Sequence, residues 1–196
     1  MASRCADDAF FGCRFSLYPM TDRFVNVILD SLAALRVPGI EMETDDVSTC
    51  LVGPESAVFA ALRDCLARAS SGGTHVVMTA TFSKGCPGEP SAARLDLPLS
   101  GASPRVVSEE DLARPAACQV SVYPLGESDY MDTIYQVIET YKQRGLYGGS
   151  PHFCTRLDGS IAQVFASLEE TFRQATERAR HTVMVATISC NSPSRR

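Results

Sequence analysis

The sequence predicts an α+β fold made of two consecutive β-α-β-β-α-β units, each with an antiparallel sheet and with its helices on one face of that sheet. Two observations lead to this prediction. The stretch HVVMTATFSKGCP, which begins at His75, returns as HTVMVATISCNSP from His181, with seven of thirteen residues identical. CRFSLYPM at 13–20 likewise returns as CQVSVYPL at 118–125. An internal repeat of this length indicates a duplicated structural unit.

The first strand and the first helix of each unit follow from hydrophobic periodicity. In CRFSLY, apolar Phe15 and Leu17 alternate with polar residues, as in a strand with one buried face. After Pro19, Thr21 is a candidate N-cap for a helix. Apolar residues of that helix recur at 24, 28, 32 and 35, and again at 130, 134, 138 and 141 in the second unit. The tract VPG at 37–39 is expected to end the helix.

The rest of each unit comprises two short strands, a second helix and a last strand. The short strands are expected around 39–43 and 46–52, and Gly53-Pro54 then begins the second helix. This region also repeats, because TCLVGPESAVFAAL at 49–62 returns as TRLDGSIAQVFASL at 155–168. The last strand is HVVMTATFS. The order of elements is that of a ferredoxin-like unit.

The domain organisation predicted from these repeats is a unit at 10–90, a linker at 91–114 and a second unit at 115–196. The linker is rich in Pro, Gly, Ser and Ala, and a connection of this length is typical of either a spacer or a functional flap. Ser108, followed by Glu110 and Asp111, is a candidate start of a single helical turn.

Composition excludes several classes of function. The formal net charge is −5 and the isoelectric point is near 5.2, which argues against a nucleic-acid partner. No apolar run approaches the length of a transmembrane helix or of a signal-peptide core, so neither membrane insertion nor secretion is expected. The eight cysteines form no C-x-x-C pair and indicate reduced thiols in the cytoplasm. Three scattered histidines give no zinc spacing, and no cofactor is expected.

The polar faces of the strands suggest a binding site. If Met78 and its alternating neighbours face the helices, then His75 and Thr79 face the open side of the sheet. The same alternation exposes Ser16, Tyr18, Ser121, Tyr123 and His181. Such a mixture suits two stacked sheets with a pocket between them for a small heteroaromatic molecule. The alternative is purely structural, because Ser and Thr are common in strands and a histidine beginning a strand often serves only to hydrogen-bond.

Catalysis has little support in the sequence. None of the common nucleophile, zinc-protease or phosphate-loop motifs is present. Asp45-Asp46 is interpreted as a solvated turn. Cys86, in GCPG, is either a reactive loop thiol or an idle one. We therefore expect a protein that is not an enzyme.

The stretches FSLYPMTDRF, DDVSTCLVG, HVVMTATFSKGCPG, SDYM and ISCNSPSR together resemble the YkoF family of bacterial thiamin- and hydroxymethylpyrimidine-binding proteins. The resemblance implies tandem ferredoxin-like repeats in a cytoplasmic, non-enzymatic homodimer with one ligand site per repeat. It also implies association with an uptake transporter, and hence a role in salvage of the thiamin precursor.

Two related sites follow from the repeat and the resemblance together. The residues expected to contact ligand are Ser16, Tyr18, Asp46, Thr49, His75 and Thr79 in the first unit, and Ser121, Tyr123, His152, Thr155 and His181 in the second. The two copies differ where Asp46 is replaced by His152, Cys50 by Arg156 and Thr79 by Val185. These exchanges alter charge and hydrogen-bond donors, so the sequence predicts two sites of unequal affinity.

Two other classes of protein share this fold. A regulatory amino-acid sensor of the ACT type, or a structural dimerisation module, would use glycine-bearing loops at a helix start, which the sequence does not place there. A ferredoxin-like enzyme would need an acid or base on the open face, for which His75 and His181 are the only candidates.

Overall fold

The computed structural model describes residues 11–85 and 107–194 and confirms the α+β class. The first repeat comprises β1 (Phe11–Pro19), α1 (Phe24–Leu32), the short 3-10 turn η1 (Ala33–Leu35), β2 (Glu41–Thr44), β3 (Thr49–Val52), α2 (Glu55–Ala69), the turn η2 (Ser71–Gly73) and β4 (Val76–Lys84). After α3 (Glu109–Ala113), the second repeat comprises β5 (Pro115–Leu125), α4 (Tyr130–Gln143), β6 (Tyr147–Gly149), β7 (Thr155–Ser160), α5 (Ile161–Thr176) and β8 (His181–Cys190).

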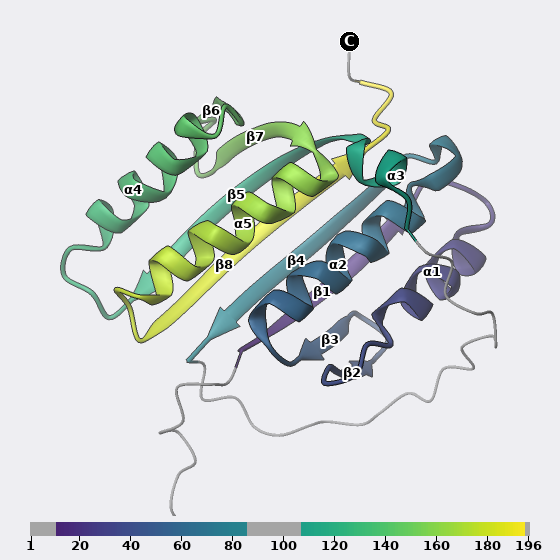
Figure 1. Ribbon diagram of the computed structural model, residues 1–196, viewed down its shortest axis with the longest axis horizontal. Helices are drawn as coiled ribbons and strands as arrows, with labels where there is room; N and C mark the ends of the chain where they lie inside the picture. The colour runs from purple at the N-terminus through teal and green to yellow at the C-terminus, as the bar shows by residue number, and fades with distance from the viewer. Residues whose placement is uncertain (1–10, 86–106, 195–196) are drawn as a thin grey trace, which may run out of the picture.

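The strands form one antiparallel sheet of eight strands in the order β2-β3-β1-β4-β8-β5-β7-β6. The helices cover one face of this sheet and leave the other face open (Figure 1). The expectation of two sheets stacked face to face is therefore wrong within one chain. The two units join edge to edge, because β4 and β8 pair along their whole length.

At the junction between the repeats, the two copies of the repeated last strand, β4 and β8, pair with each other. Ala80 lies opposite Ala186 in the β4–β8 pair, and these two residues occupy equivalent positions in the repeats. An approximate two-fold axis therefore passes between them. Two copies of one strand related by such an axis pair antiparallel, with equivalent residues facing each other across it.

The core lies between the sheet and the helices, as the alternation of apolar residues predicts. In β4, Met78, Ala80 and Phe82 are buried toward the helices. Four aromatic rings pack together in the first repeat's half of the core, with the centroids of the stacked Phe59 and Phe82 rings 4.3 Å apart. One of the four, Phe172, comes from α5 of the second repeat and lies 5.3 Å from Phe11. The two repeats thus share one core.

The start of α1 differs from the sequence prediction. The helix begins at Phe24 and not directly after Thr21. Thr21 instead forms the preceding turn: its hydroxyl accepts from the Arg23 N–H at 3.3 Å, and its carbonyl accepts from the Phe24 N–H at 3.2 Å. The prediction of Thr21 as N-cap is wrong because the chain needs one more turn to leave β1.

The segment before β5 contains the expected helical turn. The Ser108 hydroxyl accepts from the Asp111 N–H, and the Asp111 carboxylate accepts from the Ser108 N–H, which makes a capping box. Arg114 then donates to the Ala67 carbonyl and the Ser70 hydroxyl at 3.1 Å each, so that the end of this segment packs on α2. Most of the 91–114 segment lies outside the described residues, and so does Cys86. The predicted domain boundaries stay a prediction.

The described part of the chain contains no helix with both the length and the hydrophobicity needed to cross a membrane. None of the six cysteines in this part forms a disulfide. Burial raises the pKa of Cys65 and Cys118 above the ordinary thiol value, so these two behave as small core residues.

Candidate ligand pockets

The first pocket lies where β1 continues beyond its partner β3. The pairing of β1 with β3 ends at Phe15–Thr49, whereas its pairing with β4 continues to Pro19. One edge of β1 is therefore free of a neighbouring strand from Ser16 onward. The β2–β3 loop and α1 flank this edge and enclose a pocket of about 240 Å³.

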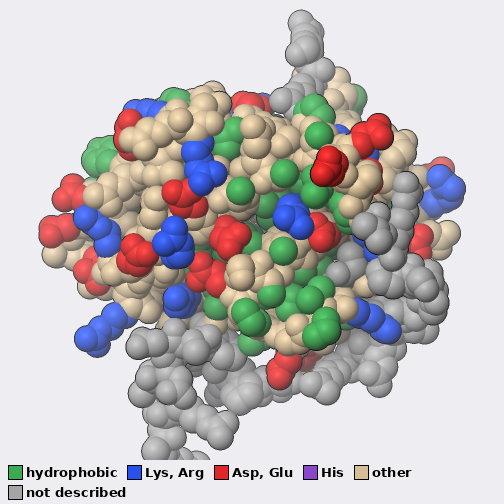
Figure 2. Space-filling view, in the orientation of Figure 1, with side chains coloured by type: hydrophobic (Ala, Val, Ile, Leu, Met, Phe, Trp, Pro, Cys, Tyr) green, Lys and Arg blue, Asp and Glu red, His purple; other side chains and the backbone are tan. Residues whose placement is uncertain are grey.

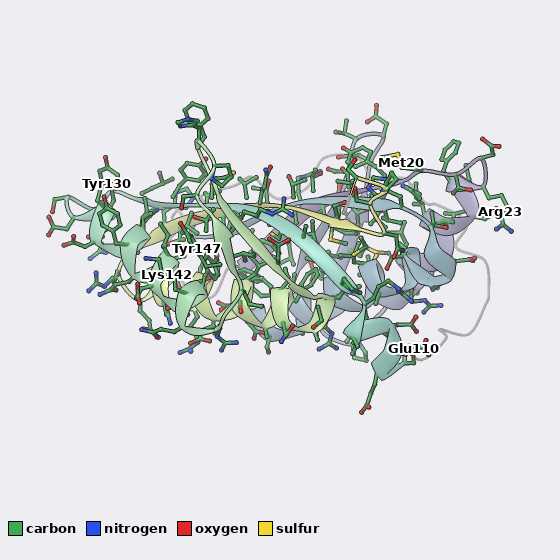
Figure 3. The ribbon with its side chains drawn as sticks, turned by 90° about the horizontal axis from the view of Figure 1, so that it is seen from above. Met20, Arg23, Glu110, Tyr130, Lys142 and Tyr147 are labelled. Carbon is green, nitrogen blue, oxygen red and sulfur yellow. The ribbon has the colours of Figure 1, made fainter. Side chains whose placement is uncertain are left out.

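The second pocket occupies the same place in the second repeat. The pairing of β5 with β7 ends at Val120–Thr155, and β5 then continues to Leu125 alongside β8 only. The β6–β7 loop and α4 enclose a pocket of about 720 Å³ beside the free edge. Tyr130, which lines it, and Met20, which follows β1, lie at opposite ends of the molecule (Figure 3).

The free edges present backbone hydrogen-bonding groups to the pockets. The Phe11 carbonyl accepts from the Gly53 N–H on the β3 side, and the Met20 N–H donates to the His75 carbonyl on the β4 side. Because successive residues of a strand point their backbone groups to alternate neighbours, the N–H and C=O of Leu17 face the free edge.

The second repeat has the same arrangement. The Arg114 carbonyl accepts from the Ile161 N–H on the β7 side of β5, at 2.9 Å. By the same alternation, the backbone N–H and C=O of Val122 face the second pocket. Each pocket therefore has one donor and one acceptor fixed side by side on a strand.

A clasp of hydrogen bonds holds the loop of the first pocket against β1. Arg14 donates to the Asp45 carboxylate at 2.8 Å and to the Ser48 hydroxyl at 2.9 Å. Asp45 also accepts from the backbone N–H groups of Ser48 and Val47. These N–H groups, with Arg14 after them, lower the pKa of Asp45 to about 2. The Ser16 hydroxyl adds a bond to the Val47 carbonyl at 3.0 Å.

The loop of the second pocket is held more loosely and ends in an aromatic residue. The Ser121 hydroxyl donates to the Phe153 carbonyl at 2.9 Å, which matches the bond made by Ser16. The Phe153 side chain is 98% exposed, and its backbone has a positive φ of 75°. An aromatic residue in this conformation is strained and often marks a functional loop.

The floor of the second pocket carries a buried polar pair. The Tyr141 hydroxyl lies 2.8 Å from the Thr171 hydroxyl, and both side chains are buried. Burial is the main cause that raises the pKa of Tyr141, which keeps the phenol neutral. The corresponding positions in the first repeat are Leu35 and Cys65, which are both buried and carry no hydroxyl group.

Eight of the eleven predicted site residues line these two pockets. Tyr18 and Tyr123 are about half exposed, at 49% and 48%, and present ring surface to a ligand. The residues of the first pocket are Ser16, Tyr18, Asp46 and Thr49, and those of the second are Ser121, Tyr123, His152 and Thr155. Whether they bind a ligand stays a prediction.

The other three predicted residues, His75, Thr79 and His181, line neither pocket. They lie near the junction of the repeats, where the His75 imidazole hydrogen-bonds the Ser189 hydroxyl at 3.1 Å. In the equivalent pair, His181 and Ser83, a buried imidazole nitrogen and a buried hydroxyl have no hydrogen-bond partner among the described residues. The alternation rule placed all three on the open face, but it carried no information on where along the strands a pocket would open.

Sequence reasoning missed the helix residues that line the pockets. Ile28 and Ile134 occupy equivalent positions in α1 and α4 and line the first and second pocket respectively. Both belong to the apolar stripes that were assigned to the core. The exposure of Phe24 and Tyr130 shows that each stripe leaves the core at its beginning. The only available signal was that Ile28 and Ile134 lie near the beginning of each stripe, directly after Phe24 and Tyr130.

The chemistry of both pockets suits a small, flat organic molecule better than a metal. Within the described ranges no group of three or more His, Cys, Asp or Glu side chains could hold a metal ion. Aromatic rings, hydroxyls, aliphatic side chains, a few carboxylates, one imidazole and one strand edge contribute to the linings. Such a site stacks a ring and fixes its orientation by a few hydrogen bonds.

Comparison with known proteins identifies the family of the chain. A model of the YKOF-related family matches residues 10–89 and 115–195, once for each repeat. A curated relative from Bacillus subtilis (strain 168), named "Putative HMP/thiamine-binding protein YkoF", is 38% identical over 196 residues. The alignment covers 98% of this chain and 96% of that relative. The family resemblance drawn from the sequence is confirmed.

Proposed function

The chain belongs to the YkoF-related family, and on this premise we propose that it binds hydroxymethylpyrimidine, thiamin or both, with one site in each repeat. The observation that supports this most is the recurrence of one pocket in both repeats, each beside the free edge of the first strand. A structural module would have no need to keep two such pockets through a duplication.

The strand edge matches the hydrogen-bonding pattern of an aminopyrimidine. A ring nitrogen of the ligand accepts from the backbone N–H of Leu17 or Val122, and the neighbouring exocyclic amine donates to the C=O of the same residue. This pairing fixes the ring in the plane of the strand. Tyr18 or Tyr123 then covers part of the ring.

The two sites are proposed to differ in affinity. The first pocket is about 240 Å³ and the second about 720 Å³, which lies within the usual range for small-molecule sites. The second pocket adds Tyr130 and Phe153 as aromatic walls. We therefore expect the second site to bind thiamin, with its two rings, more tightly than the first site does.

The assembly proposed from the family resemblance is a homodimer. The open face of the sheet carries half-buried or exposed residues such as Val77, Val183 and Val185 between hydroxyl groups. A second copy packed on this face would bury them, as sheets do in face-to-face packing. Binding without turnover in the cytoplasm suits a role in uptake or salvage of the thiamin precursor, in association with a transporter.

Calorimetric titration of the purified protein with hydroxymethylpyrimidine, and separately with thiamin, tests this function. We expect two ligands per chain and unequal affinities. An analogue with hydrogen in place of the exocyclic amine should bind at least about tenfold more weakly, because the strand carbonyl loses its donor. Absence of binding and of thermal stabilisation by both ligands would refute the function. Equal affinities would refute only the difference between the sites.

A further inference from the structure

Both pockets carry carboxylates, and within the described chain neither has a lysine or arginine in its lining. Asp45 and Asp46 line the first pocket, and Glu127 lines the second. Proteins that bind phosphate groups use arginine or lysine side chains, or helix N-termini free of acidic residues. The charge of both linings is therefore opposite to that of a phosphate site.

The arginine on the strand beside the first pocket already has an acidic partner. Arg14 donates to the Asp45 carboxylate and to the Ser48 hydroxyl, and so holds the loop rather than a ligand. Asp46 is exposed and has no hydrogen-bond or ion-pair partner among the described residues. Its negative charge therefore remains at the mouth of the pocket.

The helix N-terminus beside the second pocket is also already matched by acidic residues. Helix α4 begins at Tyr130, with Asp129 at its N-cap and Asp132 in its first turn. The Asp129 side chain makes no capping hydrogen bond, but carboxylates at these positions interact favourably with the positive end of the helix dipole and repel a further anion. Glu127, which is exposed, adds a third negative charge close by.

We propose that both pockets select the unphosphorylated ligand and reject its phosphate esters, and that Asp46 and Glu127 impose this selection. The inference rests on the proposed function, because it concerns the hydroxyl group of the same ligand. A phosphate monoester carries a charge of about −1.5 to −2 at pH 7 and would have to be desolvated beside a carboxylate. The protein then acts before phosphoryl transfer to that hydroxyl, and the phosphorylated product no longer fits its sites.

The test compares hydroxymethylpyrimidine with its monophosphate by calorimetry at pH 8, where ordinary imidazole groups are neutral. In the native protein the ester should bind at least about tenfold more weakly than the alcohol, because juxtaposed like charges are strongly unfavourable. The double variant Asp46→Lys, Glu127→Lys should bind the ester at least about tenfold more tightly than the native protein does. Both positions are exposed and lie outside helices and strands, so the fold should tolerate the change.

Glu110→Lys is the control for a charge reversal away from the pockets. Glu110 lies on α3, on the helix side of the molecule and away from both pockets (Figure 3). This variant should leave the affinities of both compounds unchanged. The helix side carries interspersed charges of both signs, so one reversal there creates no strong local field (Figure 2).

Three outcomes would overturn the inference. Equal or tighter binding of the ester by the native protein would refute the selection itself. Weak ester binding that the lysine variant leaves unchanged would refute the roles of Asp46 and Glu127 and leave pocket size as the cause. No binding of the alcohol would refute the proposed function together with the selection, whereas the first two outcomes leave that function intact.

Discussion

The loops over the two pockets are held in different ways. In the first repeat, three side-chain hydrogen bonds from Arg14 and Ser16 hold the β2–β3 loop against β1. In the second repeat, Ser121 makes the corresponding bond to the loop, and the two bonds of Arg14 have no counterpart among the described residues. Gln119, Pro151 and Cys154 stand where the first repeat has Arg14, Asp45 and Ser48.

This difference accompanies a difference in the sizes of the pockets. A clasped loop lies close to the strand and leaves about 240 Å³, whereas a loop joined by one bond leaves about 720 Å³. Duplication preserved the framework, namely the strand edge, the tyrosine and the serine that ties the loop. Divergence changed the loop contacts, and the two pockets differ in volume.

The largest expected effect is the loss of stability caused by a substitution in the core that the two repeats share. Phe172 of α5 lies within 6.3 Å of the ring centroids of Phe11, Phe59 and Phe82. Phe172→Ala should lower the free energy of unfolding by about 3–5 kcal/mol, because it removes a fully buried ring. Urea unfolding followed by circular dichroism measures the change.

The equivalent residue in the first repeat provides the comparison. Leu66→Ala should cost about 2–5 kcal/mol, and both variants should unfold in a single transition. Two separate transitions in the native protein would show that the repeats are independent units and would contradict the shared core.

The polar pair beneath the second pocket should give the next largest effect. Thr171→Val keeps the shape of the side chain but leaves the buried Tyr141 hydroxyl without its partner. The free energy of unfolding should fall by about 1–3 kcal/mol. The control in the first repeat is Cys65→Val, which removes no such bond and should cost less than about 1.5 kcal/mol. A larger loss in the control would contradict the assignment.

The loop clasp can be tested by replacing Arg14 with glutamine, the residue that the second repeat has at the equivalent position, 119. Arg14→Gln should release the β2–β3 loop and raise the affinity of the first pocket for thiamin by roughly two- to fivefold, as expected for a weak exposed ion pair that opposes opening. Calorimetric titration measures this effect most clearly when the second pocket is blocked. Unchanged or weaker binding would show that the clasp does not limit the pocket.

The smallest effect is the response of the clasp to pH. The pKa of Asp45 is lowered from 3.8 to about 2, so its contribution to stability is complete above pH 3.8 and is lost as the pH falls through about 2. The Val47 and Ser48 amide resonances should titrate near pH 2 by NMR, and those of Phe153 and Cys154 should not. A midpoint near 3.8 would contradict the observed hydrogen bonds.

Much of this fold could be predicted from the sequence, because strands and helices follow local periodicity. The repeat, the buried faces of β1 and β4 and the capping box at Ser108 all rest on patterns within a few residues. The joining of the two sheets depends on which strand edges meet, and that is a property of the whole chain. Nothing in the alternation of β4 distinguishes an edge strand from a central one.

The pockets could be predicted only in part, for a related physical reason. Ser16, Tyr18 and Thr49 were predicted from the repeat together with the family resemblance, and they line the first pocket. Their grouping arises because β3 ends before β1 does, and this difference in strand length is not encoded at any single position. Ile28 was missed because a half-buried pocket residue and a core residue look alike in sequence.

The most direct test of two pockets in one chain is to block each in turn. Ile28 and Ile134 are half-buried and line the first and second pocket. We would titrate thiamin into the native protein and into the variants Ile28→Trp, Ile134→Trp and the double variant. Two ligands per chain should fall to one in each single variant and to none in the double variant, with Ile134→Trp losing the tighter site. Two ligands still bound by a folded double variant would contradict the assignment of these pockets.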